Sequence, residues 1–430
     1  SPMKPVTSSL LQSFGADYEA SAERRIATLA LSKSELNSVA FFSKGAGTMR
    51  QKFSVEVPTL EVTNQKARGR CWLFAATNEL SQGYLAFWDK FERCNYFLES
   101  ILETADLPTN DRTVMHILST GVHDGGQWDM FANIVRKYGV VPKDVYDETY
   151  QSSNTRNMNA QLNRALKVTA AKLRKMTAEK ADEAAIQTEK NKSLDAIYGF
   201  LCSCYGEPPK AFDFEFVDKD KVYHIEKDLT PLTFAERYVG DLLDQIVSII
   251  NAPTADKPYH KTYTIRLLGN VAEGRPVVHL NLTMDEFKAA IIAQLKAGKV
   301  VWFGSDVGHY GERTMGIWDD NSFDFAALTG LPLAMDKTDA LDYGLAAMNH
   351  AMVLTGVNLD EAGKPTRWKI ENSWGDKNGE KGYYVCSDSW FDQYVFQAAV
   401  EKEYLGDLAK LAAQEPIVLE PWDPMGTLAD

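Results

Sequence analysis

Residues 65–76, with the sequence Gln65-Lys-Ala-Arg-Gly-Arg-Cys71-Trp-Leu-Phe-Ala-Ala76, change from a polar loop to an apolar run at Cys71. Good helix formers continue to about Cys94, so the pattern predicts a helix with Cys71 in its first turn. Unpaired N–H groups and the helix dipole lower the pKa of a thiol there and favour the nucleophilic thiolate. Gln65 offers a side-chain N–H donor for an oxyanion beside that thiolate.

A nucleophilic thiolate needs a base, and the base needs a group that orients it. His350 opens the apolar segment 350–354, which is typical of a strand. Asn372 follows a second predicted strand, in the sequence Glu371-Asn-Ser-Trp-Gly375. We therefore predict His350 as the base and Asn372 as its orienting partner.

These motifs occur in a fixed order, Gln-x5-Cys-Trp, then Asn-His-Ala, then Asn-Ser-Trp-Gly. In that order they resemble the papain-like cysteine peptidases. The sequence of residues 69–74, Gly-Arg-Cys-Trp-Leu-Phe, is similar to one branch, the bleomycin hydrolase and bacterial aminopeptidase C family. The resemblance implies an α+β fold, with a two-lobed papain-like core of one helical lobe and one antiparallel β lobe, enlarged by a mostly helical insertion.

The resemblance also implies roles for neighbouring residues. Trp374 is expected to shield the His350–Asn372 hydrogen bond and to contribute to substrate binding. Gly125 and Gly126 follow Asp124 and precede Gln127-Trp128. On the residues alone, a loop before a helix explains this glycine pair equally well. Papain-like enzymes use such a segment to pair with the substrate backbone, which favours a substrate-binding role for Gly125 and Gly126.

The C-terminal sequence Trp422-Asp-Pro-Met-Gly426 reads by itself as a frayed terminus. Enzymes of the bleomycin hydrolase family, however, thread a tail of this sequence into their own cleft. The resemblance therefore predicts that Ala429 and Asp430 lie where the first residue of a substrate binds. A carboxylate there would attract a free α-ammonium group, so we predict an aminopeptidase acting on peptides with a free N-terminus.

The chain divides into three predicted parts. Residues 1–150 would form the N-terminal half of the core with the nucleophile helix, and residues 281–430 the C-terminal half with His350, Asn372 and the tail. Between them, residues 151–280 begin with a helical stretch rich in Ala, Lys, Glu and Gln. We interpret this part as an insertion for assembly or access to the site. A homo-oligomer, by resemblance a hexamer, is expected.

Composition excludes several other classes of protein. The net charge of −13 is the opposite of what a nucleic-acid-binding surface needs, so no nucleic-acid partner is expected. No apolar run is long enough for a membrane span, and the N-terminal residues show no secretory signal pattern. The five scattered cysteines do not form a disulfide framework or a zinc motif, which predicts a reducing, cytoplasmic location.

Two alternatives to the aminopeptidase remain open. The chain could be an endopeptidase of the same fold without the exopeptidase restriction, or a non-catalytic scaffold that retains the motifs. No His-Glu-x-x-His, Gly-x-Ser-x-Gly or P-loop motif is present in the sequence. The predicted chemistry uses only side chains and water, so no metal or organic cofactor is expected.

Overall fold

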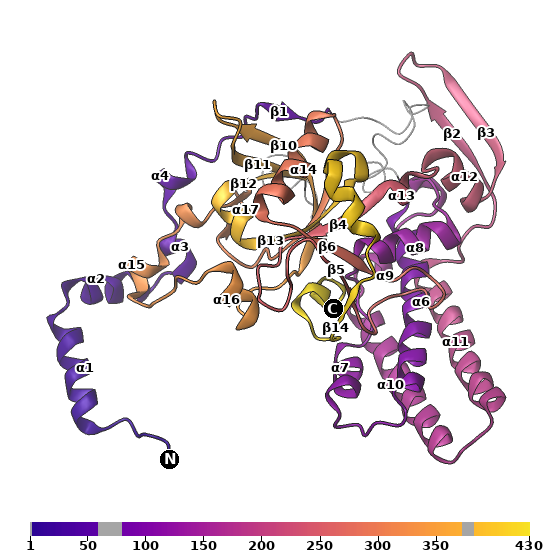
Figure 1. Ribbon diagram of the computed structural model, residues 1–430, viewed down its shortest axis with the longest axis horizontal. Helices are drawn as coiled ribbons and strands as arrows, with labels where there is room; N and C mark the ends of the chain where they lie inside the picture. Colours follow the sequence, from indigo (N-terminus) through magenta and orange to yellow (C-terminus); the bar gives the residue numbers. More distant parts are fainter. Residues whose placement is uncertain (1, 59–79, 372–381) are drawn as a thin grey trace.

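The computed structural model describes residues 2–58, 80–371 and 382–430. Figure 1 shows a group of long helices beside a large β-sheet, with an N-terminal arm reaching away from the sheet. Helices and strands are both abundant, and most strand pairs are antiparallel. The predicted α+β class is therefore confirmed.

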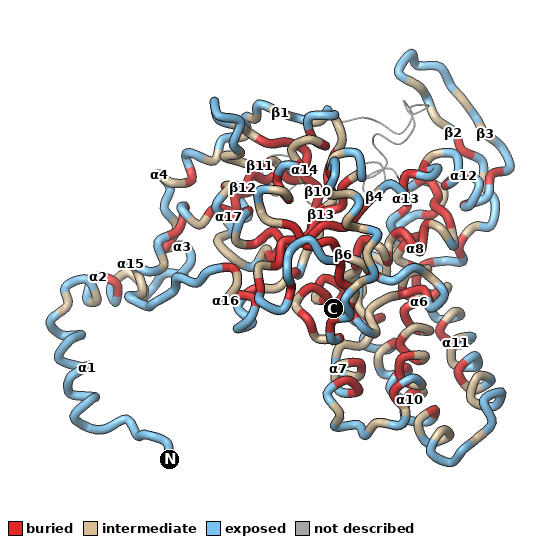
Figure 2. Tube along the Cα trace, in the orientation of Figure 1, coloured by how far each residue is buried: buried red, intermediate tan, exposed pale blue. Residues whose placement is uncertain are grey.

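The N-terminal arm consists of four short helices, α1 (Ser8–Ala20), α2 (Ala22–Leu31), α3 (Leu36–Ala40) and α4 (Ser43–Ala46). Thr7 caps α1 and Ser21 caps α2, each through its side-chain oxygen. The Arg24 guanidinium donates to the carbonyl oxygens of Ala327 and Leu328, both at 3.0 Å. These hydrogen bonds attach α2 to residues 327 and 328. Helix α1, in contrast, has no buried residue (Figure 2).

The helical group lies on the other side of the molecule. Its elements are α6 (Gln82–Glu103), α7 (Arg112–Thr120), α8 (Trp128–Tyr138), the 3-10 helix η2 (Lys143–Val145), α9 (Tyr150–Ser153), α10 (Arg156–Ala178) and α11 (Glu183–Tyr205). Helices α6, α10 and α11 bury apolar residues at helical spacing, among them Leu98 and Leu166. Helix α6 is therefore central to this group.

The course of α6 differs from the prediction at both ends. Leu80 forms a β-bridge with Pro142, and the Ser81 side chain caps α6 by accepting from the Tyr84 N–H, so α6 begins at Gln82; the predicted start at Cys71 lies outside the described residues. At the other end the helix passes Cys94 and continues to Glu103. It continues because Phe97, Leu98 and Ile101 extend its buried face.

A two-stranded hairpin follows the helical group, with β2 (Phe212–Val217) paired to β3 (Tyr223–Leu229). Two helices, α12 (Pro231–Tyr238) and α13 (Leu242–Gln245), lead from the hairpin to the main sheet. Phe214 of the hairpin packs edge-on against Phe234 of α12, with ring centroids 5.2 Å apart.

In the described ranges the main sheet has 12 strands, in the order β14-β5-β6-β4-β13-β7-β10-β11-β12-β9-β8, with β1 paired to β10. The strands are β1 (Val55–Glu56), β4 (Ile246–Ile250), β5 (Thr262–Ile265), β6 (Val278–Asn281), β7 (Val301–Ser305), β8 (Gly311–Glu312), β9 (Ile317–Trp318), β10 (His350–Leu359), β11 (Pro365–Glu371), β12 (Tyr383–Ser387), β13 (Val395–Glu401) and β14 (Ile417–Leu419). Strands β4, β5 and β6 come from the predicted insertion 151–280. The three-part division of the chain stays a prediction.

Shorter helices and turns flank the sheet. They are α14 (Met284–Lys296), η3 (Asp320–Ser322), α15 (Phe325–Thr329), α16 (Lys337–Asp342), α17 (Asp388–Tyr394), η4 (Lys402–Ala413) and η5 (Pro424–Ala429). Thr283 and Glu286 form the capping box that their spacing predicts, and α14 begins directly after Thr283.

The helical group and the sheet pack against each other through a shared apolar cluster. Trp128 of α8 lies 5.8 Å from Trp302 of β7, measured between ring centroids. Val353 of β10 and Ala399 of β13 belong to the same buried cluster. The start of α8 is thereby held next to β7 and to β10, the strand that carries His350.

Candidate active site

The predicted site residues fall into two groups. Gln65, Cys71, Asn372 and Trp374 lie outside the described residues, so their roles stay predictions. The structure describes His350, Gly125, Gly126, Ala429 and Asp430. The geometry of this second group, and of the residues around it, defines the candidate site.

His350 is the first residue of β10 and is half-buried. Strand β10 pairs with β7, and His350 lies opposite Ser305 in that ladder. The N–H of Asn349 donates to the Ser305 carbonyl at 3.0 Å. The main chain at His350 is therefore fixed by a central strand of the sheet.

Asp306, the residue after β7, organises the turn that precedes His350. Its Oδ1 accepts from the Asn349 amide at 2.8 Å, and its Oδ2 accepts from the Ala347 N–H at 3.2 Å. His309 also contacts Oδ2, through Nε2 at 3.0 Å. Burial opposes ionisation of Asp306, but the bonds from His309 and nearby backbone N–H groups outweigh it and lower the pKa of Asp306. The result is a buried carboxylate that holds Asn349, the neighbour of His350.

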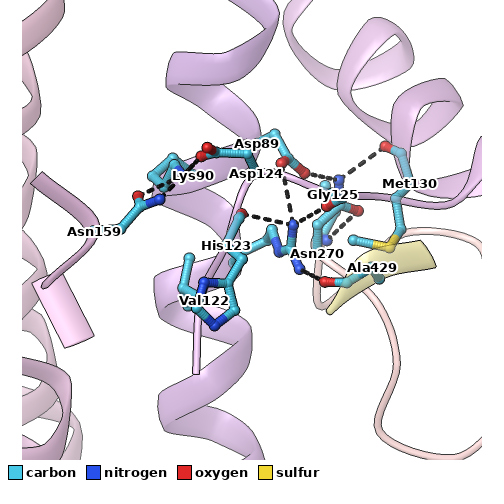
Figure 3. Close-up of polar contacts among 12 residues, drawn as sticks. Asp89, Lys90, Val122, His123, Asp124, Gly125, Met130, Asn159, Asn270 and Ala429 are labelled. Carbon is cyan, nitrogen blue, oxygen red and sulfur yellow. Dashed lines mark hydrogen bonds and ion pairs between the residues drawn. The ribbon is translucent and has the colours of Figure 1, made fainter. Parts of the chain in front are cut away.

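The loop with Gly125 and Gly126 joins α7 to α8, and two cations of α6 hold it. Lys90 forms an ion pair with Asp124, and Arg93 donates to the carbonyls of His123 and Gly125 (Figure 3). The side chain of Lys90 is 2% exposed and that of Arg93 is 7% exposed. Buried charges require such partners, so the loop and the helix fix each other.

The C-terminal tail lies against both sides of this site. On the helical side, the Gln127 amide donates to the Met425 carbonyl at 3.2 Å. On the sheet side, the Thr427 hydroxyl donates to the Met348 carbonyl at 2.8 Å, two residues before His350. Leu428 is buried and packs against Gly304 of β7. The tail therefore bridges the Gly125 loop and the strand that carries His350.

The last two residues of the chain are held differently from each other. Ala429 is 1% exposed, and its carbonyl accepts from the Arg93 guanidinium. Asp430 keeps solvent-exposed surface, yet partial burial raises the pKa of its carboxyl to about 6, against the opposing positive charge of Arg93. The structure thus brings Gly125, Ala429 and Asp430 together, whereas a β-carbon placed on Gly126 would meet no described tail atom within 4 Å.

Arg93 and Asp306 belong to the site but were not predicted from the sequence. A usable signal for Arg93 was available, because Lys90 and Arg93 interrupt the apolar face of α6, where a charge requires buried partners. For Asp306 the signal is its position at the end of a buried strand. Neither signal identifies the groups that Arg93 or Asp306 binds.

Among the residues that the structure describes, no group of three His, Cys, Asp or Glu side chains could hold a metal ion. No described helix is long and apolar enough to cross a membrane. Cys94, Cys202, Cys204 and Cys386, the cysteines in the described ranges, are free thiols.

Comparisons with known proteins agree with the motifs. The model of the peptidase C1-like family matches residues 5–426. Aminopeptidase C of Streptococcus thermophilus is 51% identical over 394 residues, which is 88% of each chain. Aminopeptidase C of Listeria monocytogenes serovar 1/2a is 43% identical over 435 residues, covering 97% of this chain and 98% of the relative.

A solved structure matches almost the whole chain as well. The crystal structure of PepW from Lactobacillus rhamnosis superposes with a TM-score of 0.92 at 48% identity, over 98% of this chain and 99% of that one. The predicted resemblance to papain-like peptidases of the aminopeptidase C branch is confirmed. On the family match and these identities, the chain belongs to the peptidase C1-like family.

Proposed function

We propose that the chain is a cysteine aminopeptidase that removes N-terminal residues from peptides. Relatives named aminopeptidase C cover nearly its whole length. The observation that carries the proposal is the position of its own C-terminal tail, which is buried between Gly125 and Met348. Because the tail occupies one end of the site, a peptide substrate can enter it only with its terminal residue.

The proposed reaction proceeds through an acyl-enzyme. The Cys71 thiolate attacks the carbonyl carbon of the first peptide bond, and Gln65 with the Cys71 N–H stabilises the oxyanion. His350, as imidazolium, protonates the leaving amine as the C–N bond breaks. Water then attacks the thioester with His350 as base, which releases the amino acid and restores the thiolate. Asn372 orients His350, and Trp374 shields their hydrogen bond.

The tail supplies the proposed selectivity for N-termini. Asp430 carries a side-chain carboxyl group, and its main-chain oxygen lies 3.4 Å from the point where a β-carbon on Gly125 would stand. A free α-ammonium group would be attracted there, whereas a longer or N-acetylated peptide would meet the tail. Binding energy from the free amino group would thus help to place the first peptide bond at Cys71.

The test compares peptide amides that differ only in N-acetylation. We expect hydrolysis of the free substrate with little hydrolysis of the acetylated one, and a loss of this preference when Leu428 to Asp430 are deleted. Val418→Ala is the control, because Val418 precedes the tail, is 62% exposed and lies in strand β14, which pairs with β5. Equal hydrolysis of both substrates by the intact enzyme would favour the endopeptidase. No hydrolysis of either would favour the scaffold.

We also propose a reducing, cytoplasmic location without a metal or organic cofactor. The free thiols Cys94, Cys202, Cys204 and Cys386 support this location, because extracellular proteins of this kind usually pair their cysteines. Every step of the proposed reaction uses side chains of the chain and water. Substrates would be peptides with a free N-terminus, and no nucleic-acid or membrane partner is proposed.

A homo-oligomer, by family resemblance a hexamer, is the proposed assembly, with residues 151–280 as an insertion that serves assembly or access. The N-terminal arm supports an apolar partner surface. Helix α1 exposes Leu11 and Phe14 at 59% and 56%, and α2 exposes Leu29 at 75%. Such residues on a projecting arm favour contact with a second copy (Figure 2). Sedimentation that gives a stable monomer of 48.1 kDa would contradict this assembly.

A further inference from the structure

Arg93 of α6 is a buried cation surrounded by main-chain oxygens. Its guanidinium donates to the carbonyls of His123, at 2.9 Å, of Gly125 and of Ala429 (Figure 3). The three acceptors come from two segments far apart in the sequence, the Gly125 loop and the C-terminal tail. A guanidinium has five N–H donors in a rigid fork, so it can bind several carbonyls at once, which an ammonium group does with less defined geometry.

The positive charge of Arg93 is balanced by a carboxylate of its own helix, while its hydrogen bonds to the three carbonyls remain. Asp89, one turn earlier on α6, lies 3.7 Å from Nη1 of Arg93. The Asn270 amide donates to Asp89 at 2.8 Å and to the Met130 carbonyl at 2.8 Å, which fixes the carboxylate from its other side. Arg93 is therefore held in place by its own helix and is free to hold the loop and the tail.

Lys90 provides an internal comparison. It also binds the loop, through Asp124, and its Nζ donates to the Asn159 amide oxygen at 2.7 Å. None of its described polar contacts reaches the tail. Both cations of α6 thus anchor the loop, but of the two only Arg93 also binds the tail, where it adds to the hydrogen bond from Gln127 to Met425.

We propose that Arg93 is a positioning residue that sets the register between the C-terminal tail and Gly125, and thereby restricts substrates to those with a free amino terminus. This inference rests on the proposed aminopeptidase function. The Asp430 N–H donates to the Thr427 carbonyl at 3.0 Å, which closes a turn at the end of the tail. Because the Ala429 carbonyl is bound to Arg93, the neighbouring residue Asp430 and its carboxyl group are held beside the loop.

Removing the guanidinium would leave the buried Ala429 carbonyl without its donor. The carbonyl can regain a partner by moving to water, which releases the tail from the loop. We therefore expect Arg93→Met to raise the ratio of kcat/KM for an N-acetylated peptide amide to that for the free one by about tenfold or more. The same substitution should leave this ratio unchanged in an enzyme that already lacks Leu428 to Asp430.

A matched control is available in α10. Arg174 also donates to two main-chain carbonyls, those of Thr104, at 3.2 Å, and Leu107, but none of its described hydrogen bonds reaches the loop or the tail. Arg174→Met should lower stability without changing the substrate ratio. Arg93→Lys keeps the charge and loses the fork, so its ratio should lie between those of wild type and Arg93→Met. If Arg93→Met does not fold, the substrate ratio of Arg93→Lys tests the inference instead.

A second measurement does not depend on peptidase activity. Carboxypeptidase treatment of the intact protein, followed by mass spectrometry, reports how fast Asp430 and Ala429 are removed. Arg93→Met and, to a lesser degree, Arg93→Lys should accelerate removal, and Arg174→Met should not. An unchanged substrate ratio and removal rate in folded Arg93 variants would overturn the inference, as would an equal ratio change in the truncated enzyme. A wild-type enzyme without preference for free amino termini would instead overturn the proposed function, while the removal rates would still report on the link between Arg93 and the tail.

Discussion

The main-chain carbonyl of Leu428 lies closer than 3.0 Å to the point where a β-carbon on Gly125 would stand. The backbone conformation of Gly125 does not itself demand glycine, because Gly125 is not among the residues with positive φ. What demands glycine is the close approach of another chain segment. The glycine that was predicted to face a substrate backbone therefore faces the protein's own C-terminal tail.

Gly125→Ala should separate the tail from the loop. The added methyl group overlaps with main-chain atoms, and relief of such an overlap costs about 1–3 kcal/mol. We expect a rise in hydrolysis of N-acetylated peptides relative to free ones. Gly126→Ala is the matched control, because a β-carbon there would meet none of the described atoms within 4 Å. An identical substrate ratio in the two variants would contradict the close packing of the tail on Gly125.

Asp306→Asn should slow catalysis without weakening substrate binding. One oxygen of Asp306 accepts from the Asn349 amide and the other from the Ala347 N–H, and an amide group at position 306 cannot accept at both. The turn before His350 would shift, and a displacement of about 1 Å can cost roughly 100-fold in rate. Steady-state kinetics should show lower kcat and similar KM.

Asp111→Asn is the control for this variant. Asp111 caps α7 by accepting from the Thr113 N–H at 2.8 Å, and asparagine caps helices about as well. A kcat for Asp306→Asn equal to that of this control would show that the turn tolerates the change. A loss of kcat for Asp306→Asn alone supports a positioning role.

Activity should require the thiol of Cys71 and the imidazole of His350. Cys71→Ser and His350→Ala are each expected to abolish nearly all turnover, because the two groups act as one unit. Chelators should have no effect. Cys202→Ser, which changes a half-buried free cysteine of α11, should retain activity and its sensitivity to alkylation. Full turnover after stoichiometric alkylation of Cys71 would disprove the assignment of the nucleophile.

The stability of the protein should fall at acid pH through His279. This side chain is fully buried, and burial lowers its pKa from the ordinary value of 6.5 to about 4. Because the unfolded chain binds the proton more tightly, this contribution to stability is complete above about pH 6.5 and is lost as the pH falls toward 4. The loss is on the order of 3 kcal/mol.

Urea unfolding at several pH values between 7 and 4 measures this effect. The variant His279→Gln, which has no group that titrates in this range, should lose less unfolding free energy over the interval than wild type does. Equal losses in both proteins would assign the acid sensitivity to other groups. The Ser248 hydroxyl, 2.8 Å from Nδ1 of His279, is the contact that this substitution changes.

Much of the fold and of the chemistry was predictable from the sequence. The α+β class, the peptidase family and the capping box of Thr283 with Glu286 all follow from patterns that are local or occur in a fixed order. A cap can be predicted because its two partners lie within one helical turn. The helix α6 was only partly predictable, since its continuation past Cys94 depends on burial against α10 and α11.

The tertiary structure alone decided the partners of Arg93 and Asp306. Arg93 and Ala429 are 336 positions apart, and Asp306 and Asn349 are 43 apart, so no local pattern links them. The acceptors of Arg93 are main-chain carbonyls, which every residue possesses whatever its side chain. The sequence therefore placed a charge on a helix face and another at a strand end, and only tertiary packing determined which carbonyls would surround Arg93 and which N–H groups would bind Asp306.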